Sequence, residues 1–355
     1  MGEASQTQTA IVGNHEGGLV LSHEAPFPEL TDDIVLVRNK AVSVNPVDTK
    51  MVGPYVTPGA IAGGDFAGIV EKVGPGAAEY NIKVGDRVSG AMLGMNPLEP
   101  TLGAFAQHVG AHSAGLLKVP EGVDFETAAS MNMGFMTAGL GLFKSLDLPG
   151  YPLQPNPKPG SVLVYGGSTA TGTAAIQLLK LAGYSVIATC SEHNFGLVKS
   201  YGADNVFDYR LPTCAADIKA HTKNNLLYAL DCISTSQSMD LCYAALGRAG
   251  GRYTALEPFS EGIAATRKVV KPDWILGPVM LGRPIDWPAP HNRPAMPDMA
   301  EFGVKWRKTL QELYDKNVLR AHPLVIRSGS IEGIFAGMKD LKDGKLSGKK
   351  LIYPV

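Results

Sequence analysis

A turn of glycine and small hydroxyl residues has the composition that phosphate binding requires. The turn, Gly166-Gly-Ser-Thr-Ala-Thr-Gly172, follows the apolar residues 161–166 and precedes residues 172–182, which have helical spacing. Small residues let backbone N–H groups approach a pyrophosphate, and a helix N-terminus adds favourable charge. The spacing is not Gly-x-Gly-x-x-Gly, so a dinucleotide site is predicted from the strand and helix around the turn. The alternative is a glycine-rich turn without a ligand.

The end of the next predicted strand bears on the choice between NAD and NADP. An acidic residue there would bind the ribose 2′-OH of NAD. The strand ends at Cys190 and Ser191 follows, although a shift of one residue in register would make Glu192 the acidic selector. Hydroxyl and cationic groups suit a phosphate, so the sequence favours NADPH. The candidates for binding its 2′-phosphate are Ser191, His193, Lys199, Tyr209 and Arg210.

The composition describes a chain with an ample core and no strong electrostatic field. Of its 355 residues 45% are hydrophobic and 18% are charged, and the formal net charge is −1. This length accommodates two domains. The near-neutral charge predicts neither a nucleic-acid partner nor a membrane partner. No run of about 18 apolar residues occurs, so no transmembrane helix is predicted.

The cysteines and the first residues predict a reduced, cytoplasmic protein. Cys190, Cys214, Cys232 and Cys242 form no Cys-x-x-Cys pair. Neither a disulfide framework nor a zinc knuckle is therefore expected, and Cys232 is interpreted as structural. Residues 1–8 are polar and lack the apolar core of a signal peptide.

Two patterns of secondary structure divide the chain. Short β-rich segments separated by Gly and Pro turns predict a barrel-like N-terminal unit. Residues 125–144 have helical spacing, and from residue 161 strands and helices alternate, which predicts a parallel sheet with crossover helices. The strands are expected at 34–44, 66–73, 84–89, 161–166, 185–190, 204–207 and 227–232, and helices at 172–182 and 193–201.

The C-terminal part is predicted to contain one long loop, one helix and one strand. Residues 283–298 are too rich in proline for a helix and are predicted as a surface loop. A helix is expected over 299–317. The tail, 348–355, is predicted as a final strand that rejoins the N-terminal unit.

Three motifs resemble the medium-chain dehydrogenase/reductase superfamily. They are Asn45-Pro-Val-Asp-Thr-Lys50, the run Gly64–Gly74 and Val84-Gly-Asp-Arg-Val88, and their order fits almost the whole chain. Within this superfamily, the chain is most similar to the zinc-free, lovastatin-type trans-acting enoyl reductases of fungal polyketide synthases. This closer similarity is carried by residues 165–171, 188–195, 206–210, 228–233, 247–251, 273–278 and 287–290.

The resemblance implies both a fold and a reaction. The implied fold is α/β, with a GroES-like β-barrel catalytic domain (1–130 and 320–355) and an inserted Rossmann doubly wound parallel-sheet domain (131–319). The implied cofactor is NADPH. The implied substrate is an α,β-unsaturated thioester on an acyl carrier domain of a polyketide synthase, or of a synthase–peptide synthetase hybrid, in secondary-metabolite biosynthesis.

The resemblance also implies site residues. Glu257 stands where the lovastatin-type pattern has Asn, so the role of that side chain does not carry over. The implied cofactor contacts are Val47, Asp48, Thr49 and Lys50 at the nicotinamide half; Ser168, Thr169, Ala170 and Thr171 at the pyrophosphate; Ser191, Glu192, His193, Asn194, Lys199 and Tyr209 at the adenosine phosphate; and Leu256, Glu257 and Ile352. The implied acyl pocket consists of Met131, Asn132, Met133, Gly134, Phe135, Met136, Thr137, Leu276, Gly277, Pro278, Val279 and Met280.

Enoyl reduction needs a donor or a cation beside the thioester oxygen. Lys50, supported by Thr49, is the candidate for polarising that oxygen or supplying the proton. The alternatives are a solvated surface lysine and water as the proton source. Met131, Met133 and Met136 are interpreted either as a flexible pocket for an acyl chain or as ordinary core packing.

No metal is expected. Zinc-dependent relatives need a cysteine near residues 45–50 and a His-Glu pair after Gly63, whereas this chain has Asp48, Gly64 and Asp65 there and no cysteine before residue 190. His108 and His112 are four residues apart in a predicted strand or loop. They are interpreted as surface residues rather than as a metal pair.

Two other functions remain open. One is a stand-alone NADPH-dependent quinone or alkenal reductase, and the other is a non-catalytic NADPH-binding protein. A monomer is expected, because the resembled subfamily tends to be monomeric and the loop at 283–298 is a candidate to cover the edge of the Rossmann sheet. The same loop, with Trp287, is alternatively a contact for a synthase.

Overall fold

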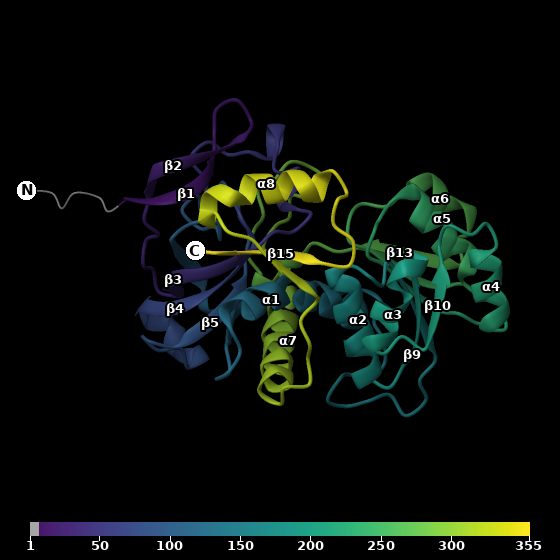
Figure 1. Cartoon of the computed structure of the whole chain (residues 1–355). Coiled ribbons are helices and arrows are strands. Elements are labelled where there is room, and N and C mark those ends of the chain that lie inside the picture. Colours follow the sequence, from purple (N-terminus) through teal and green to yellow (C-terminus); the bar gives the residue numbers. More distant parts are fainter. Residues whose placement is uncertain (1–6) are drawn as a thin grey trace, which may run out of the picture. The chain divides into compact units, whose positions relative to one another are not determined.

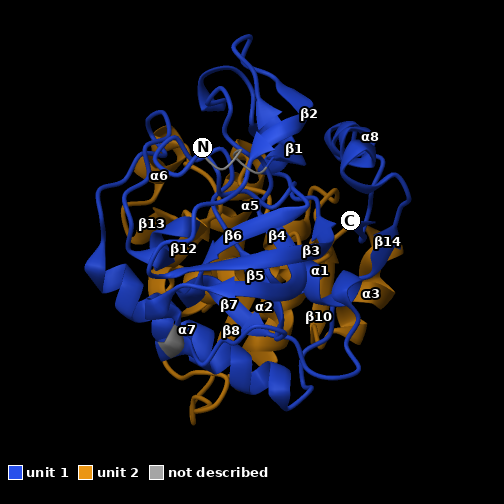
Figure 2. Ribbon diagram, turned by 90° about the vertical axis from the view of Figure 1, so that its left-hand side faces the viewer, with its two compact units in different colours: residues 1–133, 278–355 blue, residues 134–277 orange. Residues whose placement is uncertain are grey.

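The computed structural model describes the backbone of residues 7–355 and every side chain in that range except Ala78. The polar segment 1–6, part of the basis for expecting a cytoplasmic protein, lies outside the described residues. The chain forms two compact units (Figures 1 and 2): unit 1 runs up to Met133 and resumes at Pro278–Val355, and unit 2 is Gly134–Gly277. Among the described helices, none is long and apolar enough to span a bilayer.

Unit 1 is built on a seven-stranded sheet that the two ends of the chain form together. Its strand order is β14-β15-β3-β4-β5-β7, and β6 pairs with β3 beside this path. A separate antiparallel pair, β1-β2, lies outside this sheet. The strands are β1 (Thr7–Gly13), β2 (Leu19–Pro26), β3 (Ile34–Ser43), β4 (Asp65–Val73), β5 (Arg87–Ala91), β6 (His108–His112), β7 (Leu116–Lys118), β14 (Leu324–Ile326) and β15 (Lys350–Pro354).

The long strand β3 organises this sheet because it is buried along most of its length. It pairs antiparallel with β4, β6 and β15. The pairing of Ile352 with Ser43 confirms the prediction that the tail rejoins the N-terminal unit. The helices of unit 1 are α1 (Phe125–Gly139, which continues into unit 2), α7 (Pro297–Asp315) and α8 (Ser330–Lys342).

Unit 2 is a six-stranded parallel sheet with the order β10-β9-β8-β11-β12-β13. Counted from its first strand this is 3-2-1-4-5-6, the order of dinucleotide-binding sheets, and it confirms the predicted α/β class. The strands are β8 (Ser161–Tyr165), β9 (Ser185–Cys190), β10 (Asn205–Asp208), β11 (Tyr228–Asp231), β12 (Gly251–Ala255) and β13 (Val270–Trp274). The helices are α2 (Ala170–Leu181), α3 (Phe195–Ser200), α4 (Cys214–His221), α5 (Ser236–Ala245) and α6 (Glu261–Thr266).

Residues 278–319 belong to unit 1, whereas the sequence placed them in the Rossmann domain. Specific hydrogen bonds hold α7 against β7. The Arg307 Nε donates to the Leu116 carbonyl at 2.6 Å, and Gln311 exchanges two hydrogen bonds with the Lys118 backbone. Because these partners are nearly 200 residues apart, the local patterns of the sequence did not reveal the contact.

The proline-rich segment 283–298 is irregular, as predicted, but it is more than a surface loop. Trp287 is 7% exposed and its indole Nε1 donates to the Met95 carbonyl at 2.9 Å. Ile285 is also buried. The expectation of a surface loop was therefore wrong for these two side chains, which anchor the segment in unit 1.

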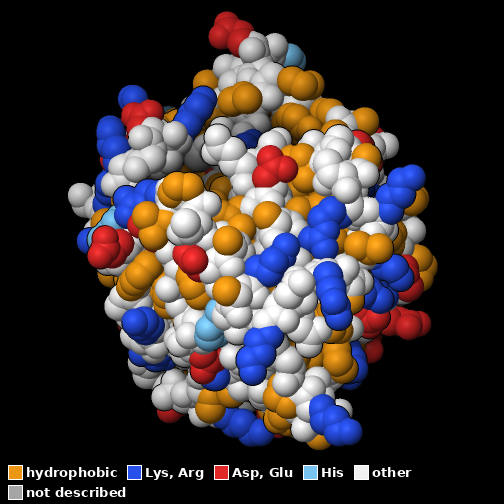
Figure 3. Space-filling view, turned by 90° about the vertical axis from the view of Figure 1, so that its right-hand side faces the viewer, with side chains coloured by type: hydrophobic (Ala, Val, Ile, Leu, Met, Phe, Trp, Pro, Cys, Tyr) orange, Lys and Arg blue, Asp and Glu red, His pale blue; other side chains and the backbone are white. Residues whose placement is uncertain are grey.

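On one face of the molecule, charged side chains of both signs are mixed with apolar ones. In Figure 3, Lys and Arg side chains cross the middle of the face, and acidic and apolar side chains lie among and around them. Exposed apolar atoms among charged groups are ordinary for a protein surface. This face therefore presents no unbroken field of one sign.

A buried ion pair ties the C-terminal strand to the sheet of unit 1. Lys350 Nζ lies 3.0 Å from Asp65 Oδ2, and their side chains are 4% and 0% exposed. Lys350 also donates to Asn45 Oδ1 at 2.6 Å. A buried carboxylate is tolerated only when its charge and lone pairs are satisfied, so these contacts are a condition of the fold.

Replacing Lys350 with Met should therefore lower the free energy of unfolding by about 3–5 kcal/mol, because Asp65 stays buried without its cation. Urea unfolding followed by tryptophan fluorescence measures this change. Lys345→Met is the matched control: Lys345 also pairs with a carboxylate, that of Asp340, but its side chain is 57% exposed. The control should lose about 1 kcal/mol or less. Equal losses in the two variants would contradict the account.

Candidate functional site

The motif at residues 45–50 forms a tight turn that ends in the short 3-10 helix Asp48–Lys50. The Asp48 carboxylate is buried and accepts the backbone N–H of Asn45 at 2.7 Å. The Thr49 hydroxyl donates to the Pro46 carbonyl at 2.8 Å. Lys50 is exposed, as is Pro46 on the same turn. The turn is thus fixed by its own side chains, and it presents Lys50 outward.

The Asp65 carboxylate connects this turn to the start of the predicted acyl pocket. Its Oδ2 accepts hydrogen bonds from Ser43 Oγ and Asn45 Nδ2, each at 2.9 Å, besides the Lys350 contact. Its Oδ1 accepts the backbone N–H of Met133 at 3.0 Å. One carboxylate therefore positions both the motif at 45–50 and Met133. In the sequence, Asp65 stands out only as a residue at a place where zinc-dependent relatives have a metal ligand.

Burial raises the pKa of Asp48 to about 7, and the negative charge of Asp65 adds to this effect. The hydrogen bond from Asn45 and the charge of Lys350 act in the opposite direction. Desolvation disfavours the charged form of a carboxyl group, so this direction is the expected one. Asp48 therefore exchanges a proton near neutral pH, immediately before Thr49 and Lys50.

The phosphate-binding turn predicted at 166–172 consists of the connection between β8 and α2 and the first three residues of α2. Thr169 caps α2, since its hydroxyl accepts the Gly172 N–H at 2.9 Å. A Cβ on Gly172 would lie 2.3 Å from the Gly166 carbonyl oxygen, so only glycine lets the helix start this close to the strand. The N–H groups of Ala170 and Thr171, in the first turn, have no partner within the helix. This geometry fits a pyrophosphate.

The segment after β9 places the predicted adenosine-phosphate residues. Ser191 precedes the 3-10 helix Glu192–Asn194, whose Asn194 side chain is buried. Glu192 and His193 are exposed, as is Lys199 on α3. Ser191 is therefore the residue that directly follows β9, and Glu192 is the next residue after it.

Arg210 and Tyr209 differ in how readily their side chains could bind a 2′-phosphate. Arg210 binds the Asp208 carboxylate through Nε at 2.9 Å and Nη2 at 2.6 Å, and this contact lowers the pKa of Asp208 to about 2. As a phosphate ligand, Arg210 would first have to leave Asp208, which weakens that candidate. Tyr209 is 40% exposed, with its ring 5.9 Å from that of Tyr165.

A second buried carboxylate, Asp231, positions the turn after β11, and the sequence analysis did not single it out. It accepts the backbone N–H groups of Ile233 and Ser234 at 2.9 Å and the Tyr253 hydroxyl at 2.8 Å. Ser234 Oγ in turn accepts the Leu256 N–H at 2.7 Å. Leu256, an implied nicotinamide contact, is thus fixed through Asp231. The available signal was an acidic residue at the end of an apolar strand, followed by Ser and Thr.

The implied acyl residues are divided between the units. Met131, Asn132, Met133, Pro278, Val279 and Met280 belong to unit 1, and Gly134, Phe135, Met136, Thr137, Leu276 and Gly277 belong to unit 2. Met131 is 6% exposed and packs as a core residue, while Met133 and Met136 are half-buried. Ile352 is fully buried among alanines and Val119, which leaves its side chain no surface for a ligand.

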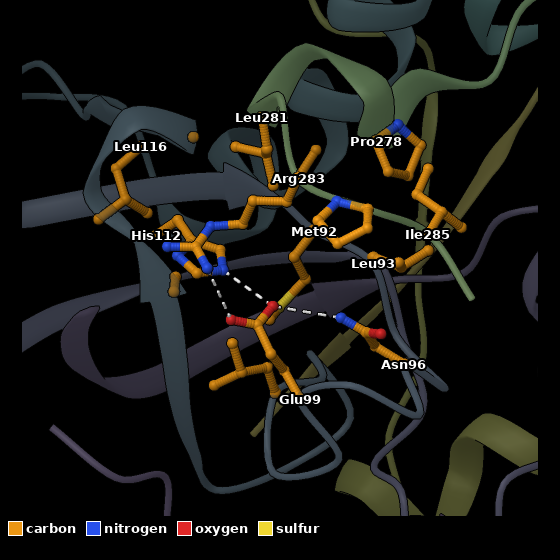
Figure 4. Close-up of a pocket in the computed structure, with 15 residues that line it drawn as sticks. Met92, Leu93, Asn96, Glu99, His112, Leu116, Pro278, Leu281, Arg283 and Ile285 are labelled. Carbon is orange, nitrogen blue, oxygen red and sulfur yellow. Dashed lines mark hydrogen bonds and ion pairs between the residues drawn. The ribbon is translucent and has the colours of Figure 1, made fainter. Parts of the chain in front are cut away.

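A small pocket, with a cavity volume of about 20 Å³, lies within unit 1 (Figure 4). Glu99 lies at its polar end and binds His112 Nε2 at 3.0 Å, Arg283 Nη1 at 3.3 Å and Asn96 Nδ2 at 3.2 Å. His112 is 8% exposed. Its interpretation as a surface residue was therefore wrong, because two carboxylates, Glu99 and Asp33, bind its ring from opposite sides.

Two family models match the chain. Residues 31–121 match the alcohol dehydrogenase GroES-like domain, and residues 170–256 match the zinc-binding dehydrogenase model. Within the described residues, no group of three or more His, Cys, Asp or Glu side chains could hold a metal ion.

Curated relatives are similar over nearly the full length. The trans-enoyl reductase fsa3 of Fusarium sp. (strain FN080326) is 61% identical, with 98% of each chain covered. The trans-enoyl reductase eqxC of Fusarium heterosporum is 60% identical over the same shares. The chain belongs to the trans-enoyl reductase family. The crystal structure of CurK enoyl reductase shares this fold with a TM-score of 0.77, at 18% identity and with 98% and 99% of the two chains covered.

Membership of the trans-enoyl reductases makes the chain an oxidoreductase of the medium-chain dehydrogenase/reductase superfamily. A nicotinamide cofactor follows from this family and from the dinucleotide order of the parallel sheet in unit 2. These findings confirm the resemblance drawn from the motifs.

The raised pKa of Asp48 predicts a pH-dependent stability. The pKa is about 7 in the folded chain and about 3.9 in an unfolded one. The folded chain therefore holds an extra proton between these values, and stability falls as the pH rises from about 4 to about 7. Asp48→Asn removes this loss. The unfolding free energy of the variant minus that of the parent chain should therefore be about 2–3 kcal/mol larger at pH 8 than at pH 5.

Urea unfolding of both chains at pH 5 and pH 8 measures this difference. A constant difference between the two chains at both pH values would show that Asp48 does not titrate in this range.

Proposed function

We propose that this trans-enoyl reductase uses NADPH to reduce the α,β double bond of a polyketide thioester carried on the acyl carrier domain of a synthase. The observation that carries the proposal is the 61% identity to a trans-enoyl reductase across 98% of both chains. Because trans-acting enoyl reductases work on a separate synthase, the proposed partner is an acyl carrier domain. It belongs to a polyketide synthase or to a synthase–peptide synthetase hybrid. We also propose that the protein acts in secondary metabolism, is located in the cytoplasm and is a monomer.

NADPH rather than NADH is proposed from the residue types after β9 and β10. Ser191 directly follows β9 where an acidic residue would select NAD. The exposed side chains of His193 and Lys199 follow β9, and that of Tyr209 follows β10; they offer an imidazole, an ammonium and a hydroxyl group. The turn Gly166–Gly172 would hold the pyrophosphate through the first N–H groups of α2, with Ser168 and Thr169 beside them.

The chemistry assigned to the chain is positioning and charge stabilisation. The bound nicotinamide is the source of the hydride that reaches the β-carbon. Lys50, presented by the rigid turn, is proposed to stabilise the negative charge that develops on the thioester oxygen. Thr49 supports it by fixing the turn through Pro46. Water is the proposed source of the proton for the α-carbon, with the Lys50 ammonium as the competing donor.

A substrate panel tests the proposed function. Purified protein is mixed with NADPH or NADH and with crotonyl and longer enoyl thioesters, or with quinones and small alkenals, and the loss of cofactor absorbance is followed. We expect NADPH oxidation with the enoyl thioesters and little with quinones. The reverse preference would indicate a quinone or alkenal reductase. Tight NADPH binding without turnover of either class would indicate a non-catalytic protein.

The same assay tests Lys50. Lys50→Ala should lower turnover of the enoyl thioester by about 100-fold, the usual effect of removing one charge-stabilising donor. The dissociation constant for NADPH, measured by fluorescence titration, should change much less. Lys158→Ala in an exposed loop of unit 2 is the control, expected to change neither value. Unchanged turnover in Lys50→Ala would remove Lys50 from the mechanism.

A further inference from the structure

The amino ends of the last three strands of unit 2 meet at one end of its sheet. β11, β12 and β13 are neighbours and run parallel, so the segments that lead into them lie side by side. Backbone hydrogen bonds join these segments. The Gly247 N–H donates to the Leu226 carbonyl at 2.8 Å, and the Gly251 N–H donates to the Val269 carbonyl at 3.2 Å. The three segments therefore form one continuous surface.

This surface carries basic residues and no acidic ones. Over residues 219–228, 246–252 and 266–271 the chain has seven Lys or Arg residues and no Asp or Glu, although its formal net charge is −1. The seven are Lys219, Lys223, Arg248, Arg252, Arg267, Lys268 and Lys271. A local excess of one sign on a nearly neutral chain attracts partners of the opposite sign.

Two of these basic side chains serve the fold itself. Arg267 donates through Nη1 to the Leu246 carbonyl at 3.0 Å and through Nη2 to the Gly247 carbonyl at 2.7 Å, so it fixes the segment before β12. Arg252 pairs with Asp147 at 3.1 Å. Four other basic side chains are exposed and have no ion-pair partner within residues 7–355: Lys223, Arg248, Lys268 and Lys271. Their charges are available to a partner.

Two exposed apolar side chains lie among these charges. Leu227 is 38% exposed and Val269 is 57% exposed. Their backbone carbonyls accept the N–H groups of Arg252 and Gly251, so both positions are held in place. Fixed apolar side chains with polar groups around them are the usual composition of a protein-docking surface. A lipid surface is the weaker match, because these three segments have no exposed Trp or Tyr side chain.

The position of this surface argues against a carrier-bound acyl chain as its occupant. The predicted cofactor residues lie at the carboxyl ends of the strands, after β8 and β9, where doubly wound sheets bind dinucleotides. The basic surface lies at the amino ends instead. The five residues of β12 span about 16 Å. A group bound to this surface is therefore a full strand length away from the cofactor end of the sheet.

We propose that this basic surface docks an acidic face of the synthase that lies outside the carrier domain. The inference rests on the proposed function, because a trans-acting reductase works on a synthase to which it is not covalently joined. Docking at the amino ends leaves the carboxyl ends of the strands open to the loaded carrier domain. It also raises the effective concentration of that carrier domain around the reductase.

The charge of the surface is tested with one variant that combines Arg248→Glu, Lys268→Glu and Lys271→Glu. The probe is an intact polyketide synthase without enoyl reductase activity of its own, selected because the parent protein reduces its carrier-bound chain. With this synthase, kcat/KM of the variant should fall about tenfold or more, mainly through KM, because reversed charges repel the acidic face. With the excised, loaded carrier domain or a pantetheine thioester, kcat/KM should stay within about twofold of the parent value.

The matched control combines Lys72→Glu, Lys308→Glu and Lys342→Glu, which change the net charge equally. These lysines are exposed in unit 1, and none has an ion-pair partner among the described residues. The control should keep the parent values with all three substrates. Added salt should lower kcat/KM of the parent on the intact synthase and leave the pantetheine thioester unaffected, since salt screens exposed charges.

The outcomes separate this inference from the proposed function. An unchanged kcat/KM of the charge-reversed variant on the intact synthase, or an equal loss with the excised carrier domain, would overturn the docking surface alone. Binding of the parent, but not of this variant, to phosphatidylserine vesicles would identify a lipid surface and would also overturn it. If the parent reduces no enoyl chain on any carrier domain or pantetheine, the proposed function fails and the docking surface falls with it.

Discussion

The structure of unit 1 depends on one buried carboxylate. Asp65 is fully shielded from solvent, and each of its hydrogen bonds brings in a different part of the chain: the end of β3 through Ser43, the turn at 45–50 through Asn45, the last strand through Lys350, and α1 through the Met133 backbone. A charge in this position is stable only if all these partners are present together. The sheet, the turn that presents Lys50 and the start of the implied acyl pocket are therefore fixed as one set. The raised pKa of Asp48 is partly a consequence, because Asp65 adds a negative charge nearby.

Unit 2 uses a comparable arrangement for a different purpose. Asp231 ends β11, and backbone N–H groups and hydroxyls satisfy it, so the turn after the strand is held in one conformation. The Ser234 hydroxyl oxygen accepts the Leu256 N–H, so the fixed turn also holds the Leu256 backbone in place. In the neighbouring turn, the constraint is steric, since Gly172 lets α2 begin against Gly166. Both devices keep backbone N–H groups and turns in place before a ligand binds, and pre-organised donors bind a phosphate without the cost of ordering a loop.

Much of this architecture is visible in the sequence, because it is local. Alternating strands and helices and the turn at 166–172 predicted the parallel sheet and a nicotinamide cofactor, and the tail strand was predicted correctly. What escaped prediction depends on contacts between distant positions. Lys350 and Asp65 are 285 residues apart, and Arg307 bonds Leu116 from 191 residues away, so residues 278–319 were assigned to the other domain. His112 looked like a surface histidine because neither Asp33 nor Arg283 is near it in sequence. The pairing of Arg210 with Asp208 is local, but residue types alone did not show which partner the guanidinium takes.

The reaction proposed for this site is hydride transfer to the β-carbon of a carrier-bound enoyl thioester. Its most direct test is a single turnover with NADPH that carries deuterium at the transferable position and an enoyl chain loaded on an acyl carrier domain, followed by mass spectrometry of the released acyl group. The account predicts a saturated thioester with one deuterium, located at the β-carbon. A saturated product without deuterium, deuterium at the carbonyl carbon of a reduced thioester, or an unchanged enoyl chain would contradict it.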